Sequence, residues 1–330
     1  MNLCLHLGMP KCGSTTLQEI YRRNHILYLG KRFGDSGRIK HPAWHASVFK
    51  KIIKIKYPSE VQRVSALAEW MSAIDKQFLQ NFDTNISQNL LLSHEGVLMP
   101  SLSQFPFCYA PETFESKLMV IANNIESLRI QWGRMFGGDV KILLIKRPPL
   151  ELLASLYAQR SDNLVRPSQH AFESATKAFL KSNNRLFWDE MVEIFQRSLS
   201  GPRMLKVFDL QELGSNESLM EILEFSGCRI SQNSEGELTK HTQPISPIHI
   251  NKRRSGTDRW QIREFRKLLL VERVQFLGLY RCGFLQSLAE KFLSVVDKCC
   301  RPIILWLIKI GALRREANIT LSEELRSFFR

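Results

Sequence analysis

The hydrophobic pattern at the start of the chain predicts a strand, a glycine loop and a helix in succession. Residues 2–7 form a short apolar run that ends at Gly8, and residues 15–23 are rich in helix-forming side chains. Three later apolar runs have the length of buried strands, and a stretch with helical periodicity lies between two of them. The runs occupy residues 89–93, 140–145 and 204–208, and the helical stretch covers 115–136. Apolar strands that alternate with helices indicate a parallel sheet, so we expect a three-layer α/β/α fold with a helical C-terminal segment.

Two regions depart from this alternation and set the expected domain limits. Residues 25–58 show no clean period, and we interpret them as an insertion or a substrate-facing loop with a short helix. From residue 259 onward the pattern is helical. We therefore expect an α/β domain over residues 1–258 and a basic helical segment over 259–330, packed on the domain or lying at a membrane surface.

The C-terminal segment contains an apolar run of 12 residues, Pro302–Leu313. Such a run is too short to span a bilayer. It favours a buried core helix, and the alternative is a helix in a membrane interface, because basic side chains flank it. The flanking residues are Lys298, Arg301, Arg314 and Arg315. Peripheral membrane contact would therefore run through residues 298–315.

Charge and cysteine content narrow the class of function. The 330 residues carry a net charge of +14, and residues 240–330 contribute +10 of it, from 18 basic and 8 acidic side chains. Such a balance suits a polyanionic cofactor, an acidic glycan, an anionic membrane surface or nucleic acid, and charge alone does not choose among them. Seven cysteines without a C-x-x-C pair predict a reducing compartment and neither a disulfide framework nor a zinc site. Because no leader-like pattern follows Met1, we expect a cytoplasmic location, with membrane association as an option.

The glycine loop after the first strand has the composition of a phosphate site. Between the predicted strand and helix, backbone N–H groups and a helix N-terminus can hold a phosphate, and lysine and hydroxyl side chains add donors. The residues concerned are Lys11, Cys12, Gly13, Ser14, Thr15 and Thr16. The lysine precedes the glycine, so the loop does not fit the Walker A pattern of ATPases and GTPases. Its order, followed by Leu17-Gln18, resembles the 5′-phosphosulfate loop of sulfotransferases that use 3′-phosphoadenosine 5′-phosphosulfate (PAPS), bacterial and glycan-directed members included.

A second motif follows the apolar run at 140–145. Arg147 stands at the predicted strand end, and Ser155 lies eight residues later in the next predicted helix, so both can grip one phosphate. The pair resembles the 3′-phosphate motif of the same family, although Pro148 follows the arginine directly where the family usually has Asn or Asp. The resemblance also assigns Arg253 and Arg254 to a basic loop that closes over the nucleotide.

The acceptor must lose a proton as it attacks, so a base is expected near the carboxyl ends of the strands. Ser93-His94-Glu95 ends the run at 89–93 and resembles the Ser-x-Glu of bacterial and glycan-directed members. Cytosolic members use a histidine near this place, and this chain offers both residues. Alternation along a strand would point His94 and Glu95 in opposite directions. We favour Glu95 as the base, with His94 as the alternative and Lys11 neutralising the departing phosphate.

The resemblance implies a P-loop-like fold that moves a sulfonate group from PAPS to an acceptor hydroxyl. The acceptor class it suggests is a saccharide, polysaccharide or glycolipid, and no metal is needed. One alternative is a basic nucleotide-dependent kinase. The other is a non-catalytic protein that binds polyanions or membranes, which would show salt-dependent binding that is independent of Lys11. Nucleic acid is not the expected partner, and the pattern leaves the oligomeric state open.

Overall fold

The structure is a computed structural model, and the chain divides into two compact units that interleave along the sequence. The first, which we call the sheet unit, comprises Met1–Pro100, Glu112–Arg147 and Phe187–Ile250, and the second, the helical unit, comprises the remainder. The residues that the structure describes are 1–8, 12, 17–18, 20–21, 27–30, 42–77, 79, 89–98, 105–106, 114–183, 188–199, 204–227, 259–266 and 283–327. The domain limits expected from the sequence stay a prediction.

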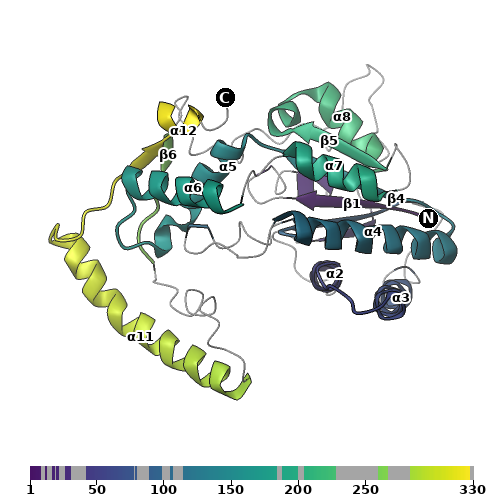
Figure 1. Cartoon of the computed structure of the whole chain (residues 1–330), viewed down its shortest axis with the longest axis horizontal. Coiled ribbons are helices and arrows are strands. Elements are labelled where there is room, and N and C mark those ends of the chain that lie inside the picture. The colour runs from purple at the N-terminus through teal and green to yellow at the C-terminus, as the bar shows by residue number, and fades with distance from the viewer. Residues whose placement is uncertain are drawn as a thin grey trace. The chain divides into compact units, whose positions relative to one another are not determined.

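A five-stranded parallel sheet forms the centre of the sheet unit, in the order β2-β3-β1-β4-β5. Figure 1 labels three of its strands, β1, β4 and β5. The strands are β1 (Asn2–Gly8), β2 (Leu27–Leu29), β3 (Asn89–Glu95), β4 (Val140–Lys146) and β5 (Leu205–Asp209). Four of them coincide with the apolar runs of the sequence, whereas β2 falls inside the region interpreted as an insertion. Its three residues are too few to show a period.

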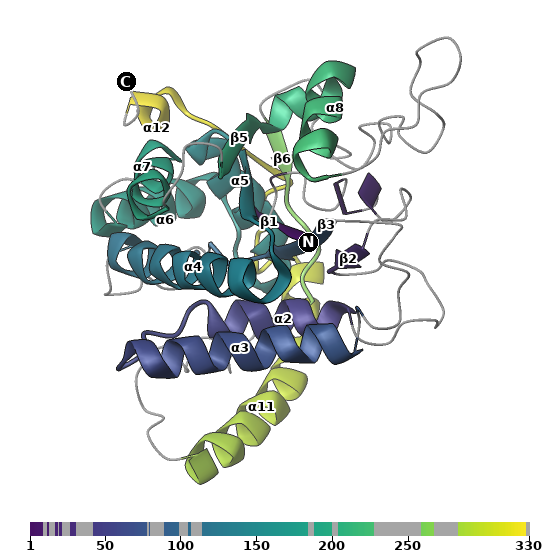
Figure 2. The same ribbon diagram turned by 90° about the vertical axis from the view of Figure 1, so that its right-hand side faces the viewer.

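Helices cover both faces of this sheet. They are α2 (Pro42–Ile52), α3 (Glu60–Gln77), α4 (Phe114–Phe136), α7 (Trp188–Ser198) and α8 (Asn216–Phe225), with the 3₁₀ helix η4 (Leu210–Gly214). The chain moves one way along the sheet from β1 to β2 and back from β2 to β5. Because crossovers are right-handed, the helices of the sheet unit between β2 and β5 lie on the face opposite to the helical turn that carries Gln18, between β1 and β2. Figure 2 shows α2, α3 and α4 on one side of the strands and α8 on the other. The three-layer α/β/α prediction is confirmed.

The core of the sheet unit is built from the central strands. Leu3 and Leu5 on β1 and Ile142 and Leu143 on β4 are fully buried, and each such side chain contributes about 1.5–3 kcal/mol relative to exposure. Trp132 on α4 is also buried, and its indole nitrogen donates to the carbonyl oxygen of Met1 at 2.8 Å. The start of β1 is thereby fixed to the helix that covers it.

The helical unit is made mainly of helices and one small antiparallel strand pair. Its elements are α5 (Pro149–Arg160), η3 (Ser161–Asn163), α6 (Gln169–Asn183), β6 (Arg259–Gln261), α11 (Gly283–Lys309), β7 (Asn318–Thr320) and α12 (Glu323–Ser327). Phe105 packs edge-on against Tyr157 of α5 and Phe179 of α6, which gives the unit an aromatic core. The segment after residue 259, expected to be helical, also contains the short strands β6 and β7, which pair through Trp260 and Ile319, both buried.

Arg315 joins the chain after α11 to the rest of the helical unit. Its guanidinium donates to the carbonyl oxygens of Ser161 and Arg263 at 2.7 Å each, and also to those of Leu164 and Val165. The same group lies over the ring of Phe265, 5.7 Å from its centroid. Burial lowers the pKa of Arg315, although a guanidinium keeps its charge. One side chain thus connects η3 with the segment at 263–265.

The apolar run at 302–313 is the clearest departure from expectation. It begins within α11 and continues past its end at Lys309. None of its residues is buried, and four of its large side chains are exposed, namely Ile303, Leu305, Trp306 and Ile310. The prediction of a buried core helix was therefore wrong: a short apolar run shows that a segment favours burial but does not show what buries it. Among the described residues, no helix combines the length and the apolar character needed to cross a membrane.

Candidate active site

Three of the predicted site segments meet at neighbouring strand ends of the sheet unit. β1 ends at Gly8, where the glycine loop begins, and Glu95 of β3 lies directly opposite Gly8. The amide of Gly96 donates to the carbonyl oxygen of Gly8 at 3.0 Å, which continues the pairing by one residue. On the other side of β1 lies β4, which ends at Lys146 immediately before Arg147. Because ligands of open parallel sheets collect at the carboxyl ends of the strands, this edge is the candidate active site.

A buried polar network ties the segments of this edge together. His6 of β1 and Ser93 of β3 are register partners, and the His6 Nδ1 lies 2.8 Å from the Ser93 Oγ. Gln18, in the helical turn after the loop, donates through its Nε2 to the same hydroxyl at 3.1 Å. All three side chains are buried. The network therefore fixes the helical turn that carries Gln18 relative to β1 and β3.

His6 acts in this network as a neutral group. Burial lowers its pKa from 6.5 to about 4, so the imidazole is uncharged at neutral pH and cannot serve as a cation for a phosphate. The network as a whole could not be predicted from the sequence, because Gln18 and Ser93 are 75 residues apart. Its parts were visible only as the Leu-Gln and Ser-x-Glu resemblances.

The two candidate bases end the same strand. His94 is partly exposed, and Glu95 is the last residue of β3. The side chain of Glu95 lies outside the described residues, so the choice between the two stays a prediction.

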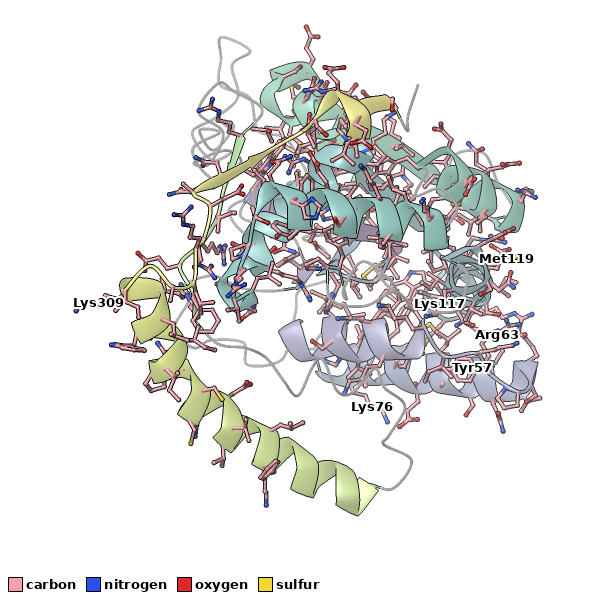
Figure 3. All side chains as sticks on the ribbon, turned by 60° about the vertical axis from the view of Figure 1, so that its left-hand side comes forward. Tyr57, Arg63, Lys76, Lys117, Met119 and Lys309 are labelled. Carbon is pink, nitrogen blue, oxygen red and sulfur yellow. The ribbon has the colours of Figure 1, made fainter. Side chains whose placement is uncertain are left out.

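Two lysines of the sheet unit approach the turn that follows Glu95. Gly96 has a φ of 86°, a conformation that favours glycine, and its carbonyl oxygen accepts from the Lys54 Nζ at 2.5 Å. A Cβ at Gly96 would lie 3.6 Å from the Nζ of Lys50. Burial, with Lys50 and then Lys117 nearby, lowers the pKa of Lys54 to about 8. Figure 3 labels Lys117 on α4. Sequence reasoning missed Lys54, because it lies in the region without a clean period.

On the other side of β1, Arg147 is buried at the end of β4. The indole nitrogen of Trp188, the first residue of α7, donates to the Arg147 carbonyl oxygen at 2.6 Å. Lys146 forms a partly exposed ion pair with Asp209, which ends β5, at 3.4 Å. The backbone that carries the predicted phosphate-binding arginine is thus fixed by α7.

A comparison with protein-family models identifies the chain. The model described as a sulfotransferase domain matches residues 4–247, most of the sequence. The chain belongs to the sulfotransferase family. Transfer of a sulfonate group is the reaction class of this family, and the membership favours it over the kinase alternative.

Three solved structures illustrate the likeness of this sulfotransferase to known proteins. Mouse sulfotransferase SULT7A1, crystallised with PAP, is 15% identical over 71% of this chain and 61% of its own, with a TM-score of 0.34. A sulfotransferase from Alicyclobacillus acidocaldarius is 11% identical over 72% and 87%, with a TM-score of 0.37. The sulfotransferase domain of the Synechococcus olefin synthase is 14% identical over 86% and 96%, with a TM-score of 0.34. The chain spans less than two thirds of the mouse enzyme, and no curated protein matches it.

The other residues predicted for the nucleotide site have mixed outcomes. Lys11, Gly13, Ser14, Thr15, Thr16, Arg253 and Arg254 lie outside the described residues. Cys12 is fully buried, and Ser155 is a partly exposed residue of α5. Because Arg147 belongs to the sheet unit and Ser155 to the helical unit, their pairing stays a prediction. Among the described residues of the sulfotransferase, no three His, Cys, Asp or Glu side chains gather where they could hold a metal ion.

Proposed function

We propose that this sulfotransferase moves a sulfonate group from PAPS to a hydroxyl of a saccharide, polysaccharide or glycolipid. The observation that carries the proposal is the order of the strand ends: β1, which ends at Gly8, lies between β3, which ends at the candidate base Glu95, and β4, which ends just before Arg147. This order offers one position for a nucleotide phosphate and an adjacent one for an acceptor.

The nucleotide half rests on the loop and on Arg147. The loop supplies backbone N–H groups, the Lys11 charge and three hydroxyl donors to the 5′-phosphosulfate. Arg147, held by Trp188, is assigned with Ser155 to the 3′-phosphate, and Arg253 and Arg254 to closure over the nucleotide. A guanidinium offers two parallel donors to one phosphate and stays charged when buried, which suits this role.

The chemistry at the acceptor is a displacement at sulfur. The acceptor oxygen attacks the sulfur, the bond between sulfur and the 5′-phosphate oxygen breaks, and its electron pair stays on adenosine 3′,5′-bisphosphate. The acceptor proton passes to Glu95, or to His94 if that side chain faces the acceptor. Lys11 balances the charge that grows on the departing phosphate. The network of His6, Ser93 and Gln18 connects β1, β3 and the helical turn that carries Gln18.

The saccharide acceptor is supported by the resemblance to glycan-directed members at two places. Leu17-Gln18 follows the loop, and Ser93 stands two residues before Glu95. In this structure the resembling residues Gln18 and Ser93 are also hydrogen-bonded to each other.

Calorimetry with adenosine 3′,5′-bisphosphate tests the nucleotide half of the proposal. We expect micromolar binding to the wild type, a loss of at least about tenfold in Lys11→Ala and in Arg147→Ala, and much weaker binding of ATP. Lys76→Ala and Arg197→Ala serve as matched controls, because both residues are exposed on helices of the sheet unit. Equal binding of ATP, or salt-dependent binding that is independent of Lys11, would support the non-catalytic alternative.

A second assay tests the acceptor. Radiolabelled PAPS is offered with a panel of saccharides, polysaccharides, glycolipids, phenols and sterols. Label should enter a sugar-containing acceptor and depend on Glu95. Labelling of phenols or sterols alone would retain the sulfotransferase but exclude the glycan acceptor.

A further inference from the structure

Helix α11 exposes a contiguous apolar stripe. Five large side chains on and just after it have exposed fractions above one half, namely Phe292 (66%), Val295 (56%), Ile303 (59%), Trp306 (58%) and Ile310 (54%). With 3.6 residues per turn, these positions fall within a sector of about 80°. Cys299, also exposed, falls in the same sector. Exposed apolar groups of this extent on one face mark an interaction surface.

Basic side chains line one border of this stripe. Lys291, Lys298 and Lys309 are all exposed, and helical geometry places them within about 20° of one another. Figure 3 shows Lys309 at the end of α11 with its side chain pointing away from the helix. Residues 291–314 contain five basic side chains and a single acidic one, Asp297. The surface is therefore apolar along its centre and cationic along its edge.

We propose that α11 binds the surface of an anionic lipid bilayer, with the apolar stripe in the acyl boundary and the lysines at the headgroups. A helix with one apolar face, basic residues beside it and a tryptophan in the stripe has the composition of an interfacial helix. Charged residues within it, such as Asp297 and Arg301, suit a helix that lies in the surface plane and not one that spans it. Lysine side chains can extend from the border of the stripe to the phosphates.

A second copy of the chain is the less suitable occupant. In a coiled coil with Phe292, Cys299 and Trp306 on one core line, the positions that flank the core normally carry charges of both signs. With these residues at position d, the flanking positions are Leu293, Val295, Cys300, Pro302, Leu307 and Lys309, of which only Lys309 is charged. Charges of both signs are therefore missing beside the core line, and charge of one sign along the border of the stripe favours an anionic surface.

Vesicle flotation with the full-length chain tests this proposal. The vesicles are phosphatidylcholine alone and phosphatidylcholine with phosphatidylglycerol in equal parts. We expect binding to the anionic vesicles, a loss of more than tenfold in the double variant Phe292→Ser/Trp306→Ser, and a loss on the order of 100-fold in the triple variant Lys291→Gln/Lys298→Gln/Lys309→Gln. Val61→Ser is the matched control, because Val61 is the most exposed valine printed for the chain and lies on α3.

Fluorescence locates the contact on the helix. Brominated anionic lipid should quench Trp306, and Trp306→Phe should remove the quenching while vesicle binding persists. Four other tryptophans, at 70, 132, 188 and 260, are buried and should contribute little. Absence of flotation with both vesicles would overturn the proposal. Concentration-dependent dimers in analytical ultracentrifugation that the Phe292→Ser/Trp306→Ser variant abolishes, without vesicle binding by the wild type, would assign the stripe to a second copy instead.

Discussion

Strand β4 and helix α11 carry similar apolar runs that meet opposite environments. Ile142 on β4 is fully buried between β1 and β5, whereas Ile303 on α11 is 59% exposed. The strand has hydrogen-bonded neighbours on both edges and helices over its faces, so its side chains are covered within the chain. The helix satisfies its own backbone and needs no such neighbours. Hydrophobicity thus shows that a segment favours burial, and its backbone partners decide where burial occurs.

The largest expected difference between substitutions in the sheet unit and substitutions on α11 is their effect on kcat. Glu95→Gln at the end of β3 should lower kcat about 100-fold or more, because it removes the proposed general base. The α11 double variant Phe292→Ser/Trp306→Ser should leave kcat with a water-soluble acceptor within about twofold, because the proposed base is untouched. Initial rates at saturating PAPS measure both. A larger loss in His94→Gln than in Glu95→Gln would transfer the role of base to the histidine.

A matched pair of isoleucine substitutions compares stability directly. Ile142→Ala should lower the free energy of unfolding by about 3 kcal/mol, because it leaves a cavity in the core. Ile303→Ala should change it by less than about 0.5 kcal/mol, since the side chain is exposed. Urea unfolding followed by circular dichroism gives both values. Equal losses would mean that α11 packs its apolar stripe against the protein itself in solution.

A smaller expected effect is the pH dependence of the free energy of unfolding that His6 causes. The pKa of His6 is lowered to about 4 in the folded chain, while an unfolded histidine titrates near 6.5. Below pH 6.5 the unfolded chain takes up a proton that the folded chain does not, so stability falls as the pH falls toward 4. Between pH 7 and pH 5 the wild type should lose about 2 kcal/mol that His6→Asn does not lose. A pH dependence that is the same in both proteins would contradict this role of His6.

Much of the sheet unit could be predicted from sequence, because its central strands are continuous buried runs with clear ends. β1, β3, β4 and β5 lie where the apolar runs are, and α4 lies where the helical period is. The missed strands are short. β2, β6 and β7 have three residues each, too few for a period to be visible. Such strands depend on neighbours that are distant in the sequence.

The candidate site likewise has parts that could be predicted from the sequence and parts that could not. The strand ends that border the candidate site, at Gly8 of β1 and Lys146 of β4, were predictable because each closes a recognisable apolar run. The contact of Lys54 with Gly96 was not, because it joins residues 42 positions apart and the lysine stands in a region without a period. The shared hydroxyl of Ser93 likewise depends on the register of β1 and β3, which the hydrophobic pattern does not specify.

Arg315 limits how far α11 can move from the rest of the helical unit, because its guanidinium donates to four carbonyl oxygens there. Arg315 follows Lys309, the last residue of α11, by six positions, and a chain of that length reaches at most about 20 Å. If α11 lies on a bilayer, this short tether keeps Arg315 and the segments that it binds within about 20 Å of the end of the helix. The search for an acceptor then becomes two-dimensional, and molecules displayed at the same surface gain an advantage in effective concentration over those in solution.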